Sequence, residues 1–166
     1  MDFQYCPVCG SELIYKTVDD RQRKVCQRCG WIYYKNPISA VAAMVSDGDR
    51  LLLVKRDIEP YKGEWCVPGG FIEFGESLND ACLRELREET SITGVPGKVI
   101  GAHIQKSKIY GEVLIVGIEV IPDKNEPVPG DDARSADFIY FTDLPEIKLE
   151  SHSRLIEEYL SYLKVK

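Results

Sequence analysis

Residues Gly70 to Ile92 read GFIEFGESLNDACLRELREETSI, a glycine-led loop that runs into a helix rich in acids. In a helix, Glu85 and Glu88 are i,i+3 neighbours and Glu85 and Glu89 are i,i+4 neighbours, so the three carboxylates share an arc of roughly 100° on one face. Like charges at that spacing repel each other. The cluster therefore predicts a site for a hard divalent cation, Mg²⁺ or Mn²⁺, which takes oxygen ligands and can bridge to phosphates.

The same acids could instead form a solvated face, as most charge runs do. The surrounding pattern favours the metal site, because the Pro68-Gly69-Gly70 turn and the Arg84-Glu85 pair stand in register with the cluster.

These residues resemble the Nudix box, G-x5-E-x7-R-E-U-x-E-E-x-G-U, where U is aliphatic. The matching positions are Gly70, Glu76, Arg84, Glu85, Leu86, Glu88, Glu89 and Ile92. Ser91 departs from the pattern, which has a glycine there. Either Ser91 adopts a left-handed conformation, at a cost of about 1–2 kcal/mol, or the helix continues to Gly94.

The resemblance implies a role for each matched residue. Glu85, Glu88 and Glu89 would be metal ligands together with the Gly70 carbonyl, and Arg84 would orient them as an ion-pair partner. Glu76 would hold the loop to the helix.

An acid outside the box is implied as general base or extra ligand, in the loop before the last strand of the sheet. Asp132, six residues before Phe138, stands at about that place. Asp131 and Asp132 could equally solvate a turn. Glu112 and Glu119 are weaker candidates for the same role.

Two C-x2-C-G knuckles occur near the N-terminus, sixteen residues apart, and their cysteines are Cys6, Cys9, Cys26 and Cys29. Two tight turns can bring four thiolates around one Zn²⁺, and a redox C-x-x-C would normally occur once. We predict a structural zinc ribbon. Its basic residues leave open a role in contacting a partner, and residues 31–34 are expected to form a strand that docks it on the rest of the chain.

The remaining cysteines, Cys66 and Cys82, are expected in the core. A catalytic cysteine would need a histidine partner, and the two histidines, His103 and His152, are expected to be bystanders.

Charge is unevenly distributed along the 166 residues, whose net charge is −6. Residues 1–35 carry six Lys/Arg and four Asp/Glu, whereas the remainder carries fifteen and twenty-three. This acidic surplus argues against a nucleic-acid partner and fits a protein that recruits metal. The N-terminus has no signal-peptide pattern and no apolar run is long enough to span a bilayer, so we expect a cytoplasmic protein without a membrane partner. Its oligomeric state is left open, a homodimer included.

The pattern of strands and helices predicts an α/β fold. Residues 1–35 form the ribbon and residues 36–166 the main domain, with strands near 38–45, 50–56, 65–67, 98–106, 112–121 and 137–141. Ser77 with Asp80 is a capping signal that starts one helix at Leu78, to end near Thr90, and a second helix is expected over 153–163. This order is similar to the Nudix α/β/α sandwich, with a mixed sheet between helices.

The ribbon followed by the box is similar to a Nudix subgroup that contains NADH pyrophosphatases and enzymes acting on ADP-ribose and FAD. The NADH enzymes carry a Ser-Gln-Pro-Trp-Pro-Phe-Pro-like array after the box, and this chain has none. The resemblance therefore implies a metal-dependent pyrophosphohydrolase that cleaves ADP-ribose, FAD or a similar compound and releases AMP. The alternatives are an NADH pyrophosphatase, a ligand-sensing regulatory domain with a partner-binding ribbon, and an RNA-processing hydrolase.

Overall fold

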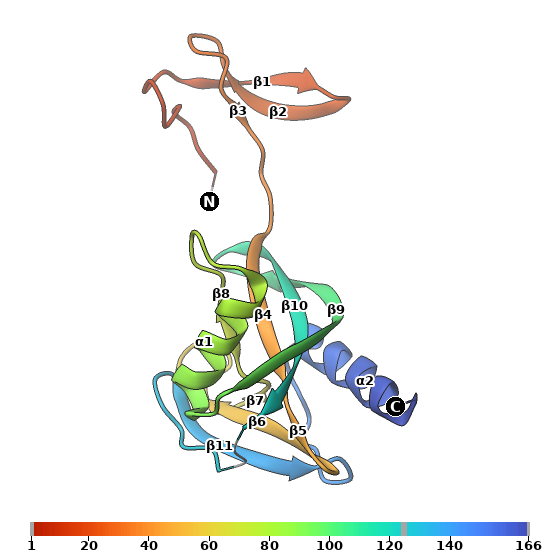
Figure 1. Cartoon of the computed structure of the whole chain (residues 1–166). Coiled ribbons are helices and arrows are strands. Elements are labelled where there is room, and N and C mark those ends of the chain that lie inside the picture. The colour runs from red at the N-terminus through yellow and green to blue at the C-terminus, as the bar shows by residue number, and fades with distance from the viewer. Residues whose placement is uncertain (1, 124–125, 166) are drawn as a thin grey trace.

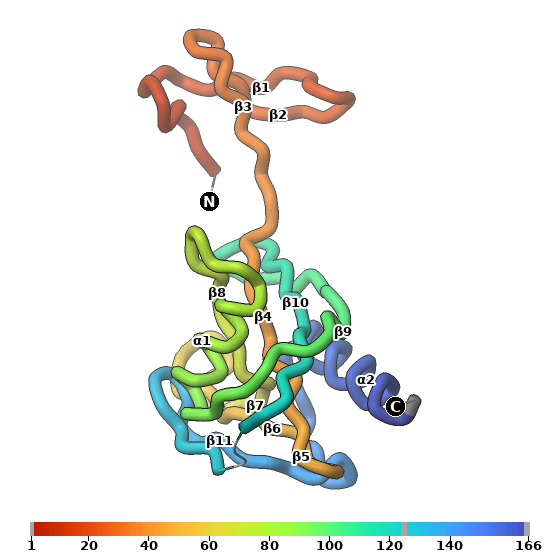
Figure 2. The backbone as a smooth tube through the Cα atoms, viewed as in Figure 1, coloured from red at the N-terminus to blue at the C-terminus, as the bar shows by residue number. Residues whose placement is uncertain are grey.

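The structure, a computed structural model, describes residues 2–123 and 126–165 (Figure 1). A small N-terminal module holds three antiparallel strands in the order β1-β2-β3. The strands are β1 (Leu13–Val18), β2 (Arg21–Cys26) and β3 (Ile32–Tyr33). An extended, exposed segment, residues 34–37, joins this module to the C-terminal domain, and the module stands apart from that domain (Figure 2).

The C-terminal domain contains two four-stranded sheets. The first sheet is mixed, in the order β8-β4-β10-β9, with β4 and β10 parallel. The second is antiparallel, in the order β11-β6-β5, with β7 also paired to β6. The strands are β4 (Ile38–Met44), β5 (Ser46–Asp47), β6 (Arg50–Arg56), β7 (Trp65–Cys66), β8 (Gly69–Phe71), β9 (Gly94–Ser107), β10 (Gly111–Pro122) and β11 (Ala133–Tyr140).

Two helices cover opposite faces of the mixed sheet (Figure 1). Strand β4 shows why: its residues alternate between two cores, because successive side chains of a strand point to opposite faces. Ala42 and Met44 pack with the residues of α2 (Glu150–Val165), whereas Val41 and Ala43 pack with those of α1 (Leu78–Thr90). The expected α/β/α sandwich with a mixed sheet is confirmed.

Three sequence predictions need correction. The Pro68-Gly69-Gly70 segment is not only a turn, because Gly69 to Phe71 form β8 against β4. A Cβ on Gly69 would lie 2.2 Å from the Val41 carbonyl oxygen, so the close approach of the two strands requires glycine. Strand β11 begins at Ala133, earlier than the expected Asp137. Residues 32–33 pair with β2 and so complete the N-terminal sheet rather than docking it on the C-terminal domain.

Among the residues that the structure describes, no helix has both the length and the apolar character needed to cross a membrane.

Candidate active site

Helix α1 carries the acid cluster, and its two ends are fixed by serines. The Ser77 hydroxyl accepts a hydrogen bond from the Asp80 amide at 3.2 Å, so the helix begins at Leu78 as expected. At the other end Ser91 adopts the left-handed conformation, with φ 57°, and its amide donates to the Arg87 carbonyl at 2.8 Å. Of the two alternatives for this end of the helix, the left-handed serine is the one adopted.

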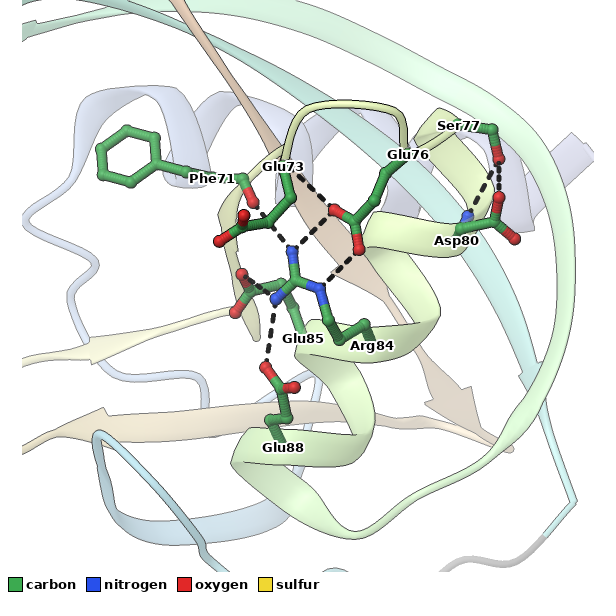
Figure 3. Close-up of polar contacts among 8 residues, drawn as sticks. All are labelled: Phe71, Glu73, Glu76, Ser77, Asp80, Arg84, Glu85 and Glu88. Carbon is green, nitrogen blue, oxygen red and sulfur yellow. Dashed lines mark hydrogen bonds and ion pairs between the residues drawn. The ribbon is translucent and has the colours of Figure 1, made fainter.

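Arg84 lies at the centre of the site and ties the box loop to the helix (Figure 3). Its Nε and Nη2 donate to the two oxygens of Glu76 at 2.7 and 2.9 Å, and Nη2 also donates to the Phe71 carbonyl at 3.0 Å. Nη1 donates to Glu85 at 2.8 Å and to Glu88 at 3.1 Å. Hydrogen bonds from Arg84 hold the pKa of Glu76 down at about 2. One guanidinium therefore fixes three carboxylates and a backbone oxygen.

Glu85 lies directly against the glycine that opens the box. A Cβ on Gly70 would come within 2.4 Å of the Glu85 carboxylate, so only glycine allows this approach. Burial raises the pKa of Glu85, and the hydrogen bond from Arg84 opposes the rise. The Gly70 backbone and the Glu85 carboxylate thus adjoin at the edge strand β8.

Glu89 is the buried member of the cluster, with 7% of its surface exposed. Its carboxylate accepts a hydrogen bond from the Gly69 amide at 3.0 Å. Burial raises the pKa of Glu89 to about 8, and the negative charges of Glu85 and Asp132 raise it further, against the Gly69 hydrogen bond and the charge of Arg56. A buried carboxylate that lacks a full counter-charge is the environment in which a bound cation is stabilising.

The three carboxylates share a face, but their oxygens are not gathered at one point. Among the described residues, only Cys6, Cys9, Cys26 and Cys29 form a group of three or more potential ligands whose atoms all lie within 4.8 Å. Glu88 turns toward Arg84 and is 40% exposed, whereas Glu89 turns inward to Gly69. Arg84 provides the positive charge for Glu85 and Glu88.

The loop before β11 lies against the end of α1. The Gly130 amide donates to the Glu89 carbonyl at 3.1 Å, and a Cβ on Gly130 would come within 2.6 Å of the Glu88 carbonyl oxygen. Asp131, whose φ is 47°, acts electrostatically on Glu85, and Asp132 acts on Glu89. The structure thus brings both candidate acids of this loop beside the glutamate cluster.

Arg56 is a neighbour of the site that the sequence reasoning did not single out. It ends β6 opposite Ala133 of β11, its Nε donates to the Pro60 carbonyl at 3.0 Å, and its charge acts on Glu89 and His152. In the sequence, Lys55 and Arg56 both follow the apolar residues of β6, and only the pairing of β6 with β11 shows that Arg56 lies opposite the start of β11, next to the acidic loop.

Two other acids lie elsewhere. Glu119 is buried on the α2 side of the sheet, where the Tyr162 hydroxyl donates to it at 3.2 Å, and Glu112 is exposed at the start of β10. The Glu119 side chain thus contacts α2 rather than α1, which makes Glu119 less suited than Asp132 to be the general base or extra ligand.

The remaining cysteines and histidines serve the packing. Cys66 and Cys82 are buried core residues, as expected. His103 contacts Glu158 on α2 at 3.1 Å, and His152 is buried in the first turn of α2.

The four N-terminal cysteines lie together, as the knuckle spacing predicts. The sulfur atoms of Cys9 and Cys26 are 3.4 Å apart, and those of Cys6 and Cys29 are 3.6 Å apart. Four sulfurs bound to one Zn²⁺ at about 2.3 Å each would stand at comparable separations. The all-sulfur donor set and these distances fit zinc.

Family models match both parts of the chain. The NUDIX domain matches residues 36–159, and the Nudix N-terminal zinc ribbon matches residues 4–35.

The match covers different shares of two curated relatives. The chain is 30% identical over 130 residues to an ADP-ribose pyrophosphatase of Methanocaldococcus jannaschii, covering 78% of this chain and 76% of that protein. It is 28% identical over 164 residues to the NAD-capped RNA hydrolase NudC of Stutzerimonas stutzeri, covering 95% of this chain but 56% of that protein. The chain thus spans little more than half of the NudC relative.

Two solved structures are similar to the fold. A NUDIX hydrolase from Nitrosomonas europaea superimposes with a TM-score of 0.80 at 23% identity, covering 96% of this chain and 91% of that one. A bifunctional NMN adenylyltransferase/ADP ribose pyrophosphatase from Francisella tularensis, complexed with AMP and a Mn ion, has a TM-score of 0.61 at 26% identity and covers 78% of this chain and 42% of that one. Since the NUDIX model matches most of its residues, the chain belongs to the Nudix family.

Proposed function

We propose that this protein is a metal-dependent pyrophosphohydrolase that cleaves a nucleoside diphosphate linked to a further group, such as ADP-ribose or FAD, and releases AMP. The observation that carries the proposal is the packing of Glu85 against Gly70 beside the buried, undercompensated Glu89. This packing brings two of the three box carboxylates to β8, because Glu85 lies against Gly70 and Glu89 accepts a hydrogen bond from the Gly69 amide.

The proposed metal ligands are Glu85, Glu88, Glu89 and the Gly70 carbonyl. Their donor atoms are all oxygens, which suits Mg²⁺ or Mn²⁺ rather than zinc. The raised pKa of Glu89 and of Glu85 supports this assignment, because a cation would offset the cost of burying both charges. When bound, such ions neutralise phosphate oxygens and activate water.

The chain's own residues would orient the metal-binding carboxylates and accept a proton from the attacking water. Arg84 holds the Glu85 and Glu88 carboxylates from one side and the Phe71 carbonyl from the other, which fixes the loop and the helix in one geometry. The Asp132 carboxylate is the proposed general base, because its loop packs on the end of α1 and its charge reaches Glu89. Asp131 lies in the same loop and is the competing candidate.

The substrate class rests on the relatives. This chain covers 76% of the ADP-ribose pyrophosphatase of Methanocaldococcus jannaschii but 56% of the NAD-capped RNA hydrolase of Stutzerimonas stutzeri, which favours the first as a guide to the substrate. The absence of the NADH-type aromatic array from the sequence also favours ADP-ribose or FAD over NADH. A purely ligand-sensing role is disfavoured, since the box glutamates and Arg84 are all in place.

The N-terminal cysteines are proposed to hold one structural Zn²⁺, with a boundary between the ribbon and the hydrolase domain near residues 35 and 36. The four sulfurs leave no open coordination position, which favours a structural role over a catalytic one.

A substrate panel tests the proposal. ADP-ribose, FAD and NADH would each be incubated with Mg²⁺ and with Mn²⁺, and the products identified by chromatography and mass spectrometry. We expect AMP as a product and a higher kcat/KM for ADP-ribose or FAD than for NADH. A clear preference for NADH or for nucleoside triphosphates would refute the proposal.

A further inference from the structure

The loop between β6 and β7, residues 57–64, borders the proposed active site. The Asp57 amide donates to the Asp132 carbonyl at 2.8 Å, so this β6–β7 loop is joined to the loop that carries the proposed general base. Arg56, the residue before it, acts electrostatically on Glu89. Both loops lie beside α1 (Figure 2). The β6–β7 loop therefore flanks the site at its Glu89 end.

The glutamates of α1 meet β8 in order, which gives the site a direction. Glu89 accepts a hydrogen bond from the Gly69 amide, and Glu85 lies against Gly70. Phe71 follows at the end of β8. The β6–β7 loop adjoins the Glu89 end and so lies at the opposite end of this row from Phe71. A substrate whose pyrophosphate lies along the glutamates would extend one of its halves toward the β6–β7 loop.

The β6–β7 loop is closed by hydrogen bonds to one residue at its base. The Arg56 amide donates to the Glu64 carbonyl at 3.0 Å, and the Gly63 amide donates to the Arg56 carbonyl at 2.8 Å. The Arg56 Nε donates to the Pro60 carbonyl at 3.0 Å. Within the loop, the Glu64 amide donates to the Tyr61 carbonyl at 3.1 Å. A loop fixed in this way keeps its shape before a ligand binds, which lowers the entropic cost of binding.

Tyr61 is the residue of this loop that the fold does not explain. Its φ is 67°, in the left-handed region, where a side chain is strained. The side chain is 38% exposed. Within residues 2–123 and 126–165, its ring meets no other ring and its hydroxyl has no hydrogen-bond partner. Strained residues that the surrounding structure holds in place cluster at sites of ligand contact.

The polar groups of the loop suit a ligand rich in hydroxyls. The Tyr61 hydroxyl can donate and accept a hydrogen bond. The exposed side chains of Lys62 and Asp57, 3.1 Å apart, add a donor and an acceptor in the same loop. Such groups around a flat ring can bind a sugar or a sugar alcohol. ADP-ribose and FAD share a group of this kind on the far side of the pyrophosphate from AMP, a ribose in one and a ribityl chain in the other.

We propose that Tyr61 and the β6–β7 loop bind the hydroxyl-rich part of the group X, so that the AMP half lies at the other end of the glutamate row. The inference rests on the proposed function, because it takes the pyrophosphate to lie along the glutamates. Tyr61 determines specificity and takes no part in the chemical step.

Calorimetric titration of the full chain, loaded with zinc and in Mg²⁺, tests this. The probes are AMP and an ADP-ribose analogue in which a methylene replaces the bridging oxygen of the pyrophosphate, so that binding is measured without hydrolysis. Tyr61→Phe keeps the ring and removes the hydroxyl. We expect it to raise the Kd of the analogue about five- to tenfold and to leave the Kd of AMP unchanged. Tyr140→Phe, at an exposed tyrosine at the far end of β11, is the matched control and should bind both probes like the wild type.

Kinetics give a second readout, in which Tyr61→Phe should raise the KM for ADP-ribose by a similar factor with kcat unchanged. An unchanged Kd of the analogue in Tyr61→Phe, or an equal loss of affinity for AMP, would overturn this inference and leave the proposed function intact. A wild type that binds the analogue without cleaving ADP-ribose would contradict the proposed function, and the binding data would still decide the inference. A wild type that binds neither probe would contradict both.

Discussion

Arg84 and Glu89 play opposite electrostatic roles within one helix. Arg84 forms ion pairs with the carboxylates of Glu76, Glu85 and Glu88. The buried Glu89 carboxylate instead accepts a hydrogen bond from the Gly69 amide. The i,i+4 spacing indicated that the acids share a face, but it could not indicate which of them is buried. Burial depends on where β8 and the loop before β11 pack, and those contacts are long-range.

His152 provides a pH-dependent prediction. Its Nδ1 is buried and finds no hydrogen-bond partner among the described residues, and burial lowers the pKa of the imidazole to about 4. Because the unfolded chain binds the proton near pH 6.5 and the folded chain does not, stability is lost as the pH falls from about 6.5 toward 4, by about 3 kcal/mol in total.

The measurement is denaturant unfolding between pH 7 and 4.5 for the wild type and for His152→Leu. The variant should lose less stability across this range than the wild type. Equal pH dependence in both proteins would show that His152 is not held neutral in the folded state.

Helix α1 shows how a local substitution at a helix end affects a whole element. Ser91 ends the helix in the left-handed region, where a side chain is strained and glycine is not. We predict that Ser91→Gly stabilises the protein by about 1 kcal/mol, which raises Tm by roughly 2–4 °C in a chain of this size. Differential scanning calorimetry checks this, with Ser91→Ala as control, which should bring no gain because alanine keeps a Cβ.

The elements themselves were largely predictable. The strands 38–45 and 50–56 and the helix 78–90 follow directly from apolar runs and from the Ser77 cap, and the structure agrees to within a residue or so. Strand β8 was missed because its two glycines are typical of a turn. Gly69 is needed there because the neighbouring strand leaves no room for a Cβ, which only the sheet topology reveals.

At the scale of the whole molecule, the N-terminal module depends on its metal. Its core consists of little more than three cysteines, Leu13 and Trp31, which is too small to fold unaided. Cys6→Ser should remove the zinc and unfold the module. Elemental analysis should find one zinc per wild-type chain and none in the variant, and a wild type without zinc would disprove the ribbon.

The chain's two modules were predictable from the cysteine spacing and from the box, but the position of the ribbon was not. Aromatic residues 31–34 suggested docking, yet Trp31 and Tyr33 stack on each other within the ribbon, at 5.9 Å between centroids. The same aromatic composition suits either arrangement, because packing preferences do not specify a partner surface. The expected cytoplasmic location stays a prediction.

The central claim is that the glutamate face of α1 catalyses hydrolysis through bound metal, and Glu88 tests it most directly. Glu88 is the most exposed of the three acids, so Glu88→Gln removes a charge without disturbing the core. Turnover of ADP-ribose would be measured across a Mg²⁺ titration for the wild type, for Glu88→Gln and for Glu157→Gln, an exposed glutamate on α2, with thermal melting of each. We expect at least a hundredfold loss of kcat in Glu88→Gln alone, with unchanged melting. More than about a tenth of wild-type activity in Glu88→Gln would contradict the account.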